Sequence, residues 1–436
     1  MANKLHIVSL GCTKNLVDTE VMMGKLQNFT LTDEAEDADV IIVNTCGFIE
    51  AAKEESINTV LTLHNNRKED SLLVMAGCLS ERYKEELSKA MPEVDIFTGV
   101  GDYDKIDILL QEKRSSFSDE VFLIDGQERI VTGSSYHAYI KLSEGCNQTC
   151  SFCAIPSFKG RLHSRDLDSI AKEVEALVEK GYYDFSFVSQ DSSSYLRDQG
   201  IRDGLSLLIQ RIELIEGVKS ARILYLYPST TTKELIDNIA KSKLFHNYFD
   251  IPIQHINDDM LRMMKRGFGK EKTIELLEYM KTKKDAFIRT SFIVGHPRET
   301  KEMFEEMCDF AKEFGFDRIN VFAYSDEEGT DAYEVNEKID EHIIQQRADI
   351  LGEIAKEAME HSLQKEVGKE IDIVIDGESQ EHEAFLSAKK LSWAPEIDGE
   401  ILVNDKTQED ELEFGIIYKA KVTEKVGNFL TATVLN

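Results

Sequence analysis

Short apolar segments that alternate with amphipathic helical segments constrain the fold of this chain more than any other feature. The expected strands of the first region lie at residues 5–11, 39–46, 71–78 and 94–100. The expected helices lie at 15–29, 50–64, 80–90 and 103–110. Because short strands that alternate with helices build βαβ units, residues 1–118 predict an N-terminal parallel α/β domain.

A second alternating region follows a polar, broken segment at 111–133, which predicts a linker carrying a short hairpin. Its expected strands lie at residues 136–143, 184–190, 221–228, 248–254, 286–295 and 318–324. Six β/α units favour a partial (β/α)6 barrel over a full eightfold barrel. We therefore predict a second domain over residues 132–362.

The tail has a different character from the rest of the chain. After a helical stretch at 340–363, short alternating segments such as EIDIVIDG, GEILVND and FGIIYKAKVTEKVG appear. This pattern is typical of a small antiparallel β-barrel of the oligonucleotide-binding type. The prediction for residues 365–436 is a third domain of that kind, and the chain as a whole is expected to be α/β.

Composition limits the compartment and the partners. No run of 18 or more apolar residues occurs, so no membrane-spanning helix is expected. The start MANKLHIVSLGC reads as a first strand and not as a signal peptide, which predicts a cytoplasmic protein. The net charge of −30 repels polyanions and attracts basic partners. The alternative is that this acidity only keeps the protein soluble.

The segment EGCNQTCSFCAIP carries the strongest chemical signal. It places Cys146, Cys150 and Cys153 just after the first strand of the second region. A loop at this spacing can point three thiolates at one four-iron cluster and leave one iron open for a ligand. A zinc site is the alternative, but zinc sites pair such cysteines with a fourth ligand at matching spacing, which the sequence lacks.

A second group of cysteines is dispersed in the sequence but equivalent in position. Cys12, Cys46 and Cys78 end or follow the first three expected strands, in SLGC, NTC and AGC. Because the carboxyl ends of parallel strands share one edge of a sheet, these thiols are expected to converge there. The functional interpretation is a second iron–sulfur cluster with an open iron. The alternative is that each is a small buried residue, which is how we interpret Cys308 in its helical apolar pattern.

Several longer segments together resemble one family, the methylthiotransferases of the radical S-adenosylmethionine superfamily. The segments are SLGCTKNLVDTE, NTCGFI, AGCLSERY, KLSEGCNQTCSFCAIP, GRLHSR and IPIQHINDDMLRMMKR. The resemblance covers nearly the whole chain, with the small C-terminal barrel corresponding to a TRAM domain. Within the family, SLGCTKNLVDTE resembles the RimO branch, which modifies a ribosomal protein.

That resemblance implies a specific chemistry. Cys146, Cys150 and Cys153 would hold a radical-generating 4Fe-4S cluster, and the other three cysteines an auxiliary 4Fe-4S cluster that carries the sulfur. S-adenosylmethionine would supply both the radical and the methyl group. The implied product is a methylthio group on the β-carbon of an aspartate in small-subunit ribosomal protein twelve. An electron donor such as flavodoxin or ferredoxin is also implied.

Charge gives an independent criterion for the branch. Residues 366–436 contain sixteen acidic residues and seven lysines, a balance of −9. A barrel that binds tRNA needs a basic face, because phosphate contacts supply most nucleic-acid affinity. We therefore expect no dominant nucleic-acid contact. The alternatives are a tRNA adenosine methylthiotransferase of the MiaB-like branch and a non-catalytic RNA-binding assembly factor.

Three further residues are candidates for binding S-adenosylmethionine. Phe152 precedes the last cysteine of the loop, as an aromatic residue does in the superfamily signature. Gln190, at a strand end, either contacts the methionine part or caps the next helix. Gly295 either lets the backbone approach the adenosine or is a turn glycine. No side chain stands out as a catalytic acid or base, since the cofactor carries the difficult step.

Overall fold

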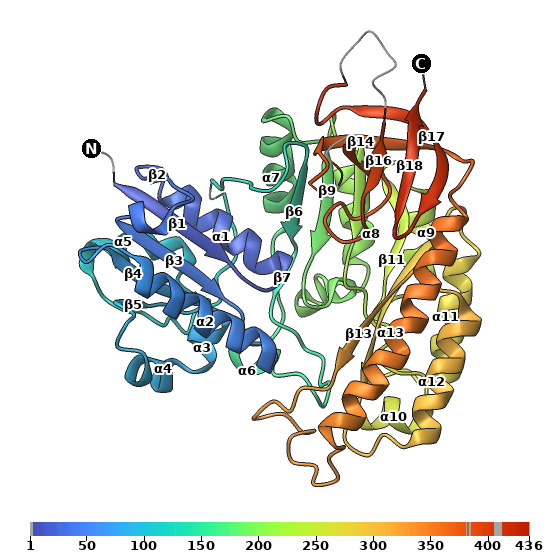
Figure 1. The fold of residues 1–436 in the computed structure, drawn as a ribbon, viewed down its shortest axis with the longest axis horizontal. Helices are drawn as coiled ribbons and strands as arrows, with labels where there is room; N and C mark the ends of the chain where they lie inside the picture. Colours follow the sequence, from blue (N-terminus) through green and yellow to red (C-terminus); the bar gives the residue numbers. More distant parts are fainter. Residues whose placement is uncertain (1–2, 127, 381, 383–384, 405–411, 436) are drawn as a thin grey trace.

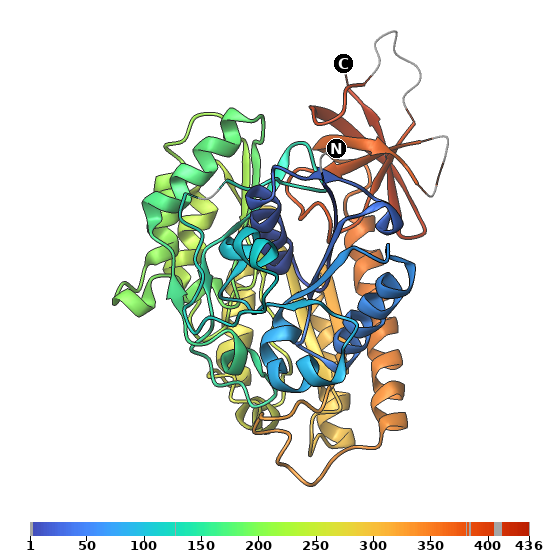
Figure 2. The ribbon, with the colours of Figure 1, turned by 90° about the vertical axis from the view of Figure 1, so that its left-hand side faces the viewer.

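The computed structural model divides the chain into three packed regions (Figures 1 and 2). It describes residues 3–126, 128–380, 382, 385–404 and 412–435. The first and third predicted domains end at residues 1 and 436, which lie outside the described residues. The predicted domain limits of 1–118, 132–362 and 365–436 stay predictions. No helix among the described residues is long and apolar enough to cross a membrane.

The N-terminal region is a five-stranded sheet in the order β2-β1-β3-β4-β5, with every pair parallel. Its strands are β1 (Lys4–Ser9), β2 (Thr30–Leu31), β3 (Val40–Thr45), β4 (Leu72–Gly77) and β5 (Ile96–Phe97). Its helices are α1 (Thr13–Lys25), α2 (Glu50–Asn66), α3 (Cys78–Arg82), α4 (Lys84–Ala90) and α5 (Ile106–Glu112). Central strand β3 is buried at every residue, as expected for a strand covered on both faces.

Two local predictions in this region are wrong. The helix expected at 80–90 is divided at Tyr83, whose backbone leaves the helical conformation between α3 and α4. No hairpin forms among the described residues of 111–133. The apolar residues of this segment pack into the core instead: Phe122 and Ile124 are buried, and the Ile130 N–H bonds the carbonyl of Glu20 in α1.

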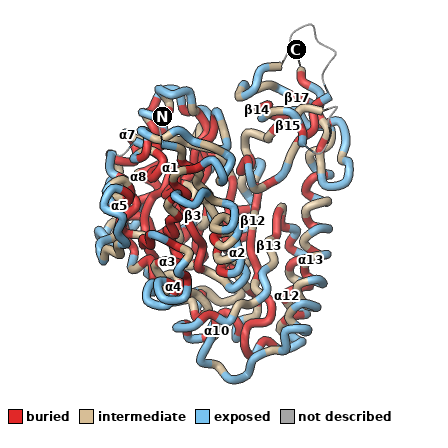
Figure 3. Tube along the Cα trace, turned by 60° about the vertical axis from the view of Figure 1, so that its left-hand side comes forward, coloured by how far each residue is buried: buried red, intermediate tan, exposed pale blue. Residues whose placement is uncertain are grey.

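The central region is a curved, all-parallel sheet of six strands in the order β13-β12-β11-β10-β9-β6. This confirms the six-stranded partial barrel. Its strands are β6 (His137–Lys141), β9 (Asp184–Val188), β10 (Ser220–Ile223), β11 (Phe245–Asp250), β12 (Phe287–Val294) and β13 (Arg318–Ala323). Helices α7 (Leu167–Glu179), α8 (Gly204–Ile212), α9 (Lys233–Lys241), α10 (Asp258–Met263), α11 (Lys270–Lys281) and α12 (Lys301–Phe314) lie between them. Figure 3 shows the buried parts of the trace gathered in the strands.

Helix α13 (Glu341–Gln364) leads into a closed five-stranded barrel in the order β14-β15-β16-β18-β17. The strands are β14 (Glu370–Glu378), β15 (Leu386–Lys390), β16 (Ile401–Val403), β17 (Ile417–Val426) and β18 (Phe429–Val434). The small barrel is confirmed, although its pairing is not wholly antiparallel, because β16 and β18 run parallel.

The small barrel closes the amino end of the larger one. Trp393 is buried and packs on Phe287, the first residue of β12, with ring centroids 5.8 Å apart. Arg318, the first residue of β13, donates to the Asp398 carbonyl at 3.0 Å. In Figure 1 the C-terminal strands accordingly cover one end of the central strands. The carboxyl ends of those strands, where sites form in parallel α/β folds, are left for chemistry.

Candidate active site

The loop with Cys146, Cys150 and Cys153 follows β6 and short strand β7 (Ser143–Glu144) at the carboxyl end of the barrel. Its closure depends on Gly145, which has φ +71° and whose added Cβ would lie 2.0 Å from the Arg161 carbonyl oxygen. The Cys146 N–H bonds the Gly160 carbonyl at 3.1 Å, which joins the two ends of the loop. All three thiols are free and partly exposed.

Protein groups already donate toward these sulfurs. The Gln148 N–H lies 3.4 Å from Cys146 Sγ, and the buried Arg266 guanidinium donates to Cys150 Sγ at 3.1 Å. Arg266 is held by the Pro252 carbonyl at 2.5 Å and by the Tyr227 ring, 4.2 Å away. Donors of this kind stabilise negative sulfur, so the surroundings suit a metal-bound thiolate.

Burial keeps two of these thiols protonated unless a metal binds. It raises the pKa of Cys146 and of Cys153 to about 12 in each case. Cysteine binds metal as the thiolate, so metal binding must displace these protons. Free, partly exposed thiols with N–H donors pointing at the sulfurs of Cys146 and Cys150 fit an iron–sulfur cluster.

The second cysteine group converges at one edge of the N-terminal sheet, as its strand-end positions predict. Cys12 caps the start of α1, Cys46 follows β3, and Cys78 follows β4 and begins α3. The strand-end turns are tightly packed: a Cβ on Gly11 would lie 2.8 Å from Cys46 Sγ. Burial raises the pKa of the Cys78 thiol to about 12, although the Lys159 ammonium lowers it.

Asn15 joins these three strand ends. Its buried amide donates to the carbonyls of Leu10 and Thr45, at 3.1 Å in both cases. Its Oδ1 accepts from Cys78 Sγ at 3.5 Å. The Asn15 side chain therefore contacts Thr45, which precedes Cys46, Leu10 in the turn before Cys12, and Cys78 itself.

We expect Asn15→Ala to lower the free energy of unfolding by roughly 2–4 kcal/mol, because it leaves two carbonyls unsatisfied. The variant should also bind less iron after anaerobic reconstitution, which iron analysis measures beside a denaturation curve. Asn28→Ala, at an exposed position just beyond the same helix, is the control and should change neither quantity. Full iron binding by Asn15→Ala would show that the amide does not position the cysteines.

The two cysteine groups face each other across the boundary between the regions. Cys78 packs against Ala154 and Phe158, which follow Cys153 directly in the chain. Helix α6 (Ile155–Phe158) carries this contact from the central region onto α3. The N-terminal cysteine group therefore contacts the segment that directly follows the cysteine loop.

A four-iron cluster binds its cysteine ligands at separate irons, so the thiols that hold one need not meet at a single point. Within the part of the chain that the structure describes, no three His, Cys, Asp or Glu side chains lie close enough to hold one metal ion.

A buried charge network ties α1 to the cysteine loop. Lys141 pairs with Asp18 and lies 3.1 Å from Glu144, while Lys159 lies 2.8 Å from Glu144 and 3.5 Å from Asp18. Burial raises the pKa of Glu144, but the two ammonium groups outweigh it and bring it to about 2. The network fixes how the two cysteine-bearing regions meet.

The three residues predicted to contact S-adenosylmethionine lie in different environments. Gln190 donates to Glu144 at 3.2 Å and leaves its own buried Oε1 without a partner in the described residues. The next helical turn begins at Asp191 without a side-chain cap, so Gln190 is not a helix cap.

Gly295 has φ +84°, and a Cβ there would lie 2.5 Å from Ile344 of α13, which favours the turn role. Phe152 is partly exposed beside Cys153. Their roles toward S-adenosylmethionine stay predictions.

Sequence reasoning missed Lys14 and Tyr225. The Lys14 ammonium lies 3.5 Å from the centre of the Tyr225 ring, and Tyr225 has φ +60° just after β10. Burial lowers the pKa of Lys14, but Tyr225, Cys12, Asp250 and Glu144 raise it above its ordinary value. The only signal in the sequence was that Lys14 follows Cys12 by two positions.

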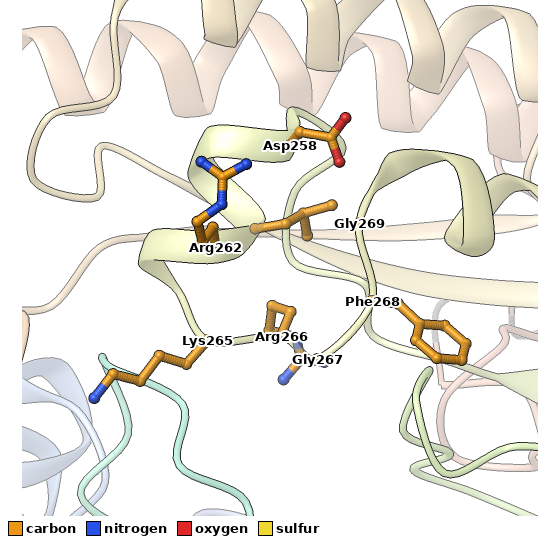
Figure 4. Close-up of a pocket in the computed structure, with 8 residues that line it drawn as sticks. Asp258, Arg262, Lys265, Arg266, Gly267, Phe268 and Gly269 are labelled. Atoms are coloured by element: carbon orange, nitrogen blue, oxygen red, sulfur yellow. The ribbon is translucent and has the colours of Figure 1, made fainter.

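A cavity of about 410 Å³ lies behind Cys150, at the turn between α10 and α11. Figure 4 shows its lining, with Asp258 and Arg262 on α10 and Lys265, Arg266 and Phe268 on the turn. Arg266 belongs to both this cavity and the surroundings of Cys150. No cysteine is among the described residues that line this cavity.

Known proteins share this arrangement. Family models match in succession: Uncharacterized protein family UPF0004 over residues 4–99, the Radical SAM superfamily over 140–311, and the TRAM domain over 367–435. The solved radical S-adenosylmethionine methyltransferase TsrM from Kitasatospora setae aligns with a TM-score of 0.51 at 15% identity, covering 74% of this chain and 73% of that one. That likeness shows the fold alone.

Curated relatives are much closer in sequence. The ribosomal protein uS12 methylthiotransferase RimO of Sulfurimonas denitrificans is 76% identical over 436 residues, covering 100% of this chain and 99% of that protein. The protein of the same name from Aliarcobacter butzleri is 63% identical, covering 99% of this chain and 97% of that one.

The fold and the cysteine loop, with these matches, define a radical S-adenosylmethionine enzyme. More narrowly, the chain belongs to the RimO family of methylthiotransferases. The expected fold class, enzyme class and branch are thereby confirmed, as is the use of S-adenosylmethionine with iron–sulfur chemistry.

Proposed function

We propose that this enzyme adds a methylthio group to the β-carbon of an aspartate in ribosomal protein uS12. The observation that carries the proposal is the pair of cysteine groups that meet through Cys78, Ala154 and Phe158. Removal of hydrogen and delivery of sulfur must act on the same carbon. Two cysteine groups joined by one packing contact support that requirement.

The six cysteines take two roles in this proposal. Cys146, Cys150 and Cys153 would hold the 4Fe-4S cluster that binds S-adenosylmethionine. The other ligand group, which comprises Cys12, Cys46 and Cys78, would hold a second 4Fe-4S cluster. When bound, these groups supply one-electron chemistry that can remove hydrogen from a carbon too weakly acidic for a side-chain base.

The protein's own residues prepare the site. The network of Asp18, Lys141, Glu144 and Lys159 is buried, so it excludes water from the boundary and fixes the distance between the regions. Arg266 and the Gln148 N–H stabilise thiolate at Cys150 and Cys146. The names of the relatives and the net charge of −30 support a basic ribosomal protein as substrate.

The electron donor and the compartment follow from the same proposal. The chemistry consumes electrons, and a small carrier such as flavodoxin or ferredoxin is the donor we propose. The cytoplasm is the proposed compartment, because ribosomal proteins are found there.

A direct comparison of substrates tests the function. Anaerobically reconstituted and reduced enzyme is given S-adenosylmethionine and either uS12 or tRNA, and both products are analysed by mass spectrometry. We expect a methylthio mass increase on one aspartate of uS12 and none in tRNA. Methylthio-adenosine in tRNA with unmodified uS12 would support the MiaB-like alternative. Absence of S-adenosylmethionine cleavage, together with salt-dependent RNA binding, would support the assembly-factor alternative.

A further inference from the structure

The side chain of Lys14 occupies an unusual position in the site. It follows Cys12 by two residues on α1, which lies between the N-terminal sheet and the barrel (Figure 1). Its ammonium sits 3.5 Å over the Tyr225 ring, at the end of barrel strand β10. The ammonium thus lies at the boundary that brings the two cysteine groups together.

The carboxylates nearest to Lys14 already have other partners. Asp250 accepts from the Tyr225 N–H at 3.0 Å and lies 3.5 Å from Arg289. Glu144 accepts from Lys159 at 2.8 Å and from Gln190 at 3.2 Å. No hydrogen bond or ion pair joins the Lys14 ammonium to any described residue, and the ammonium instead lies against the Tyr225 ring.

The neighbouring cations have carboxylate partners, which sets Lys14 apart from them. Lys141 and Lys159 pair with Asp18 and Glu144, and Arg289 lies 3.5 Å from Asp250. A partly buried cation without a paired carboxylate is costly unless a ligand supplies negative charge. The carboxylate of a bound substrate would supply that charge.

We infer that Lys14 binds the side-chain carboxylate of the substrate aspartate and so positions its β-carbon between the two cysteine groups. This inference rests on the proposed function. The β-carbon is bonded directly to the carboxylate carbon, so holding the carboxylate restricts where the β-carbon lies. The Tyr225 ring holds the ammonium at this boundary through a cation–π contact. Lys14 is therefore a specificity residue for aspartate over neutral side chains.

The test pairs enzyme variants with substrate variants. Wild-type enzyme, Lys14→Gln and Lys14→Arg are each assayed on uS12 and on uS12 whose target aspartate is replaced by asparagine. We expect Lys14→Gln to lower kcat/KM on uS12 by about 10- to 100-fold, the range for a charge-assisted hydrogen bond. The preference for aspartate over asparagine should fall by the same factor, and Lys14→Arg should recover most of it.

Controls separate this role from folding and from cluster assembly. Lys25→Gln removes an exposed charge from the same helix and should leave all parameters unchanged. Iron content and substrate-independent cleavage of S-adenosylmethionine should match wild type in Lys14→Gln. The inference fails if Lys14→Gln keeps the wild-type preference for aspartate, or if its only effect is a shifted reduction potential of the cluster at Cys12. If wild-type enzyme does not modify uS12, the proposed function fails first.

Discussion

Replacing Cys146, Cys150 and Cys153 together with alanine is expected to abolish cleavage of S-adenosylmethionine and formation of the methylthio product. The three thiols lie in one loop at the barrel mouth, and the structure provides sulfur-directed donors at Cys146 and Cys150. In the proposed function these thiols hold the cluster that binds S-adenosylmethionine, so their removal is expected to prevent electron transfer to the cofactor. Chromatography of the 5′-deoxyadenosine released by reduced enzyme measures the loss, and iron should fall from about eight to about four atoms per chain.

Cys308 supplies the control for that experiment. It is buried in α12, away from both cysteine groups, and packs in the main hydrophobic core. Cys308→Ala should therefore keep the full iron content and activity while losing about 1 kcal/mol of stability to the small cavity. Persistent cleavage by the triple variant would show that another site binds S-adenosylmethionine.

The local elements of this fold are largely predictable from the sequence, because hydrophobic periodicity is a local signal. All six barrel strands and the strand-end positions of Cys12, Cys46 and Cys78 were predicted from it. The hairpin at 111–133 failed because tertiary contacts of Phe122 and Ile124 override the local pattern. Those contacts are with distant parts of the chain.

The supporting residues of the site were not predictable in this way. Lys141 and Asp18 are 123 residues apart in sequence, and Arg266 and Cys150 are 116 apart. Asn15 resembles any polar residue near a helix start until the strand ends are in place. Such pairs leave no periodic signal, so the folded structure is needed to show which charges are paired. It also shows that Lys14 has no ion pair with the residues that are described.

The opposite experiment, replacement of Cys12, Cys46 and Cys78 by alanine, is expected to separate the two half-reactions. Cleavage of S-adenosylmethionine should continue close to the wild-type rate, since the sulfurs of Cys146 and Cys150 keep their contacts to the Gln148 N–H and to Arg266. The methylthio product should fall below detection, because the variant lacks the three proposed ligands of the cluster that carries the sulfur. Mass spectrometry of uS12 and deoxyadenosine measurement on the same samples give both readouts.

Iron content makes this outcome decisive. The variant should bind about four irons per chain, half the expected total, and should retain the spectroscopic signature of a cluster that responds to S-adenosylmethionine. Because Cys78 packs on Ala154 and Phe158, a modest change in that signature is compatible with the lost contact. Methylthiolated uS12 from the triple variant, or retention of all the iron, would remove these cysteines from the sulfur-transfer site and leave the convergence of three strand ends without a chemical role.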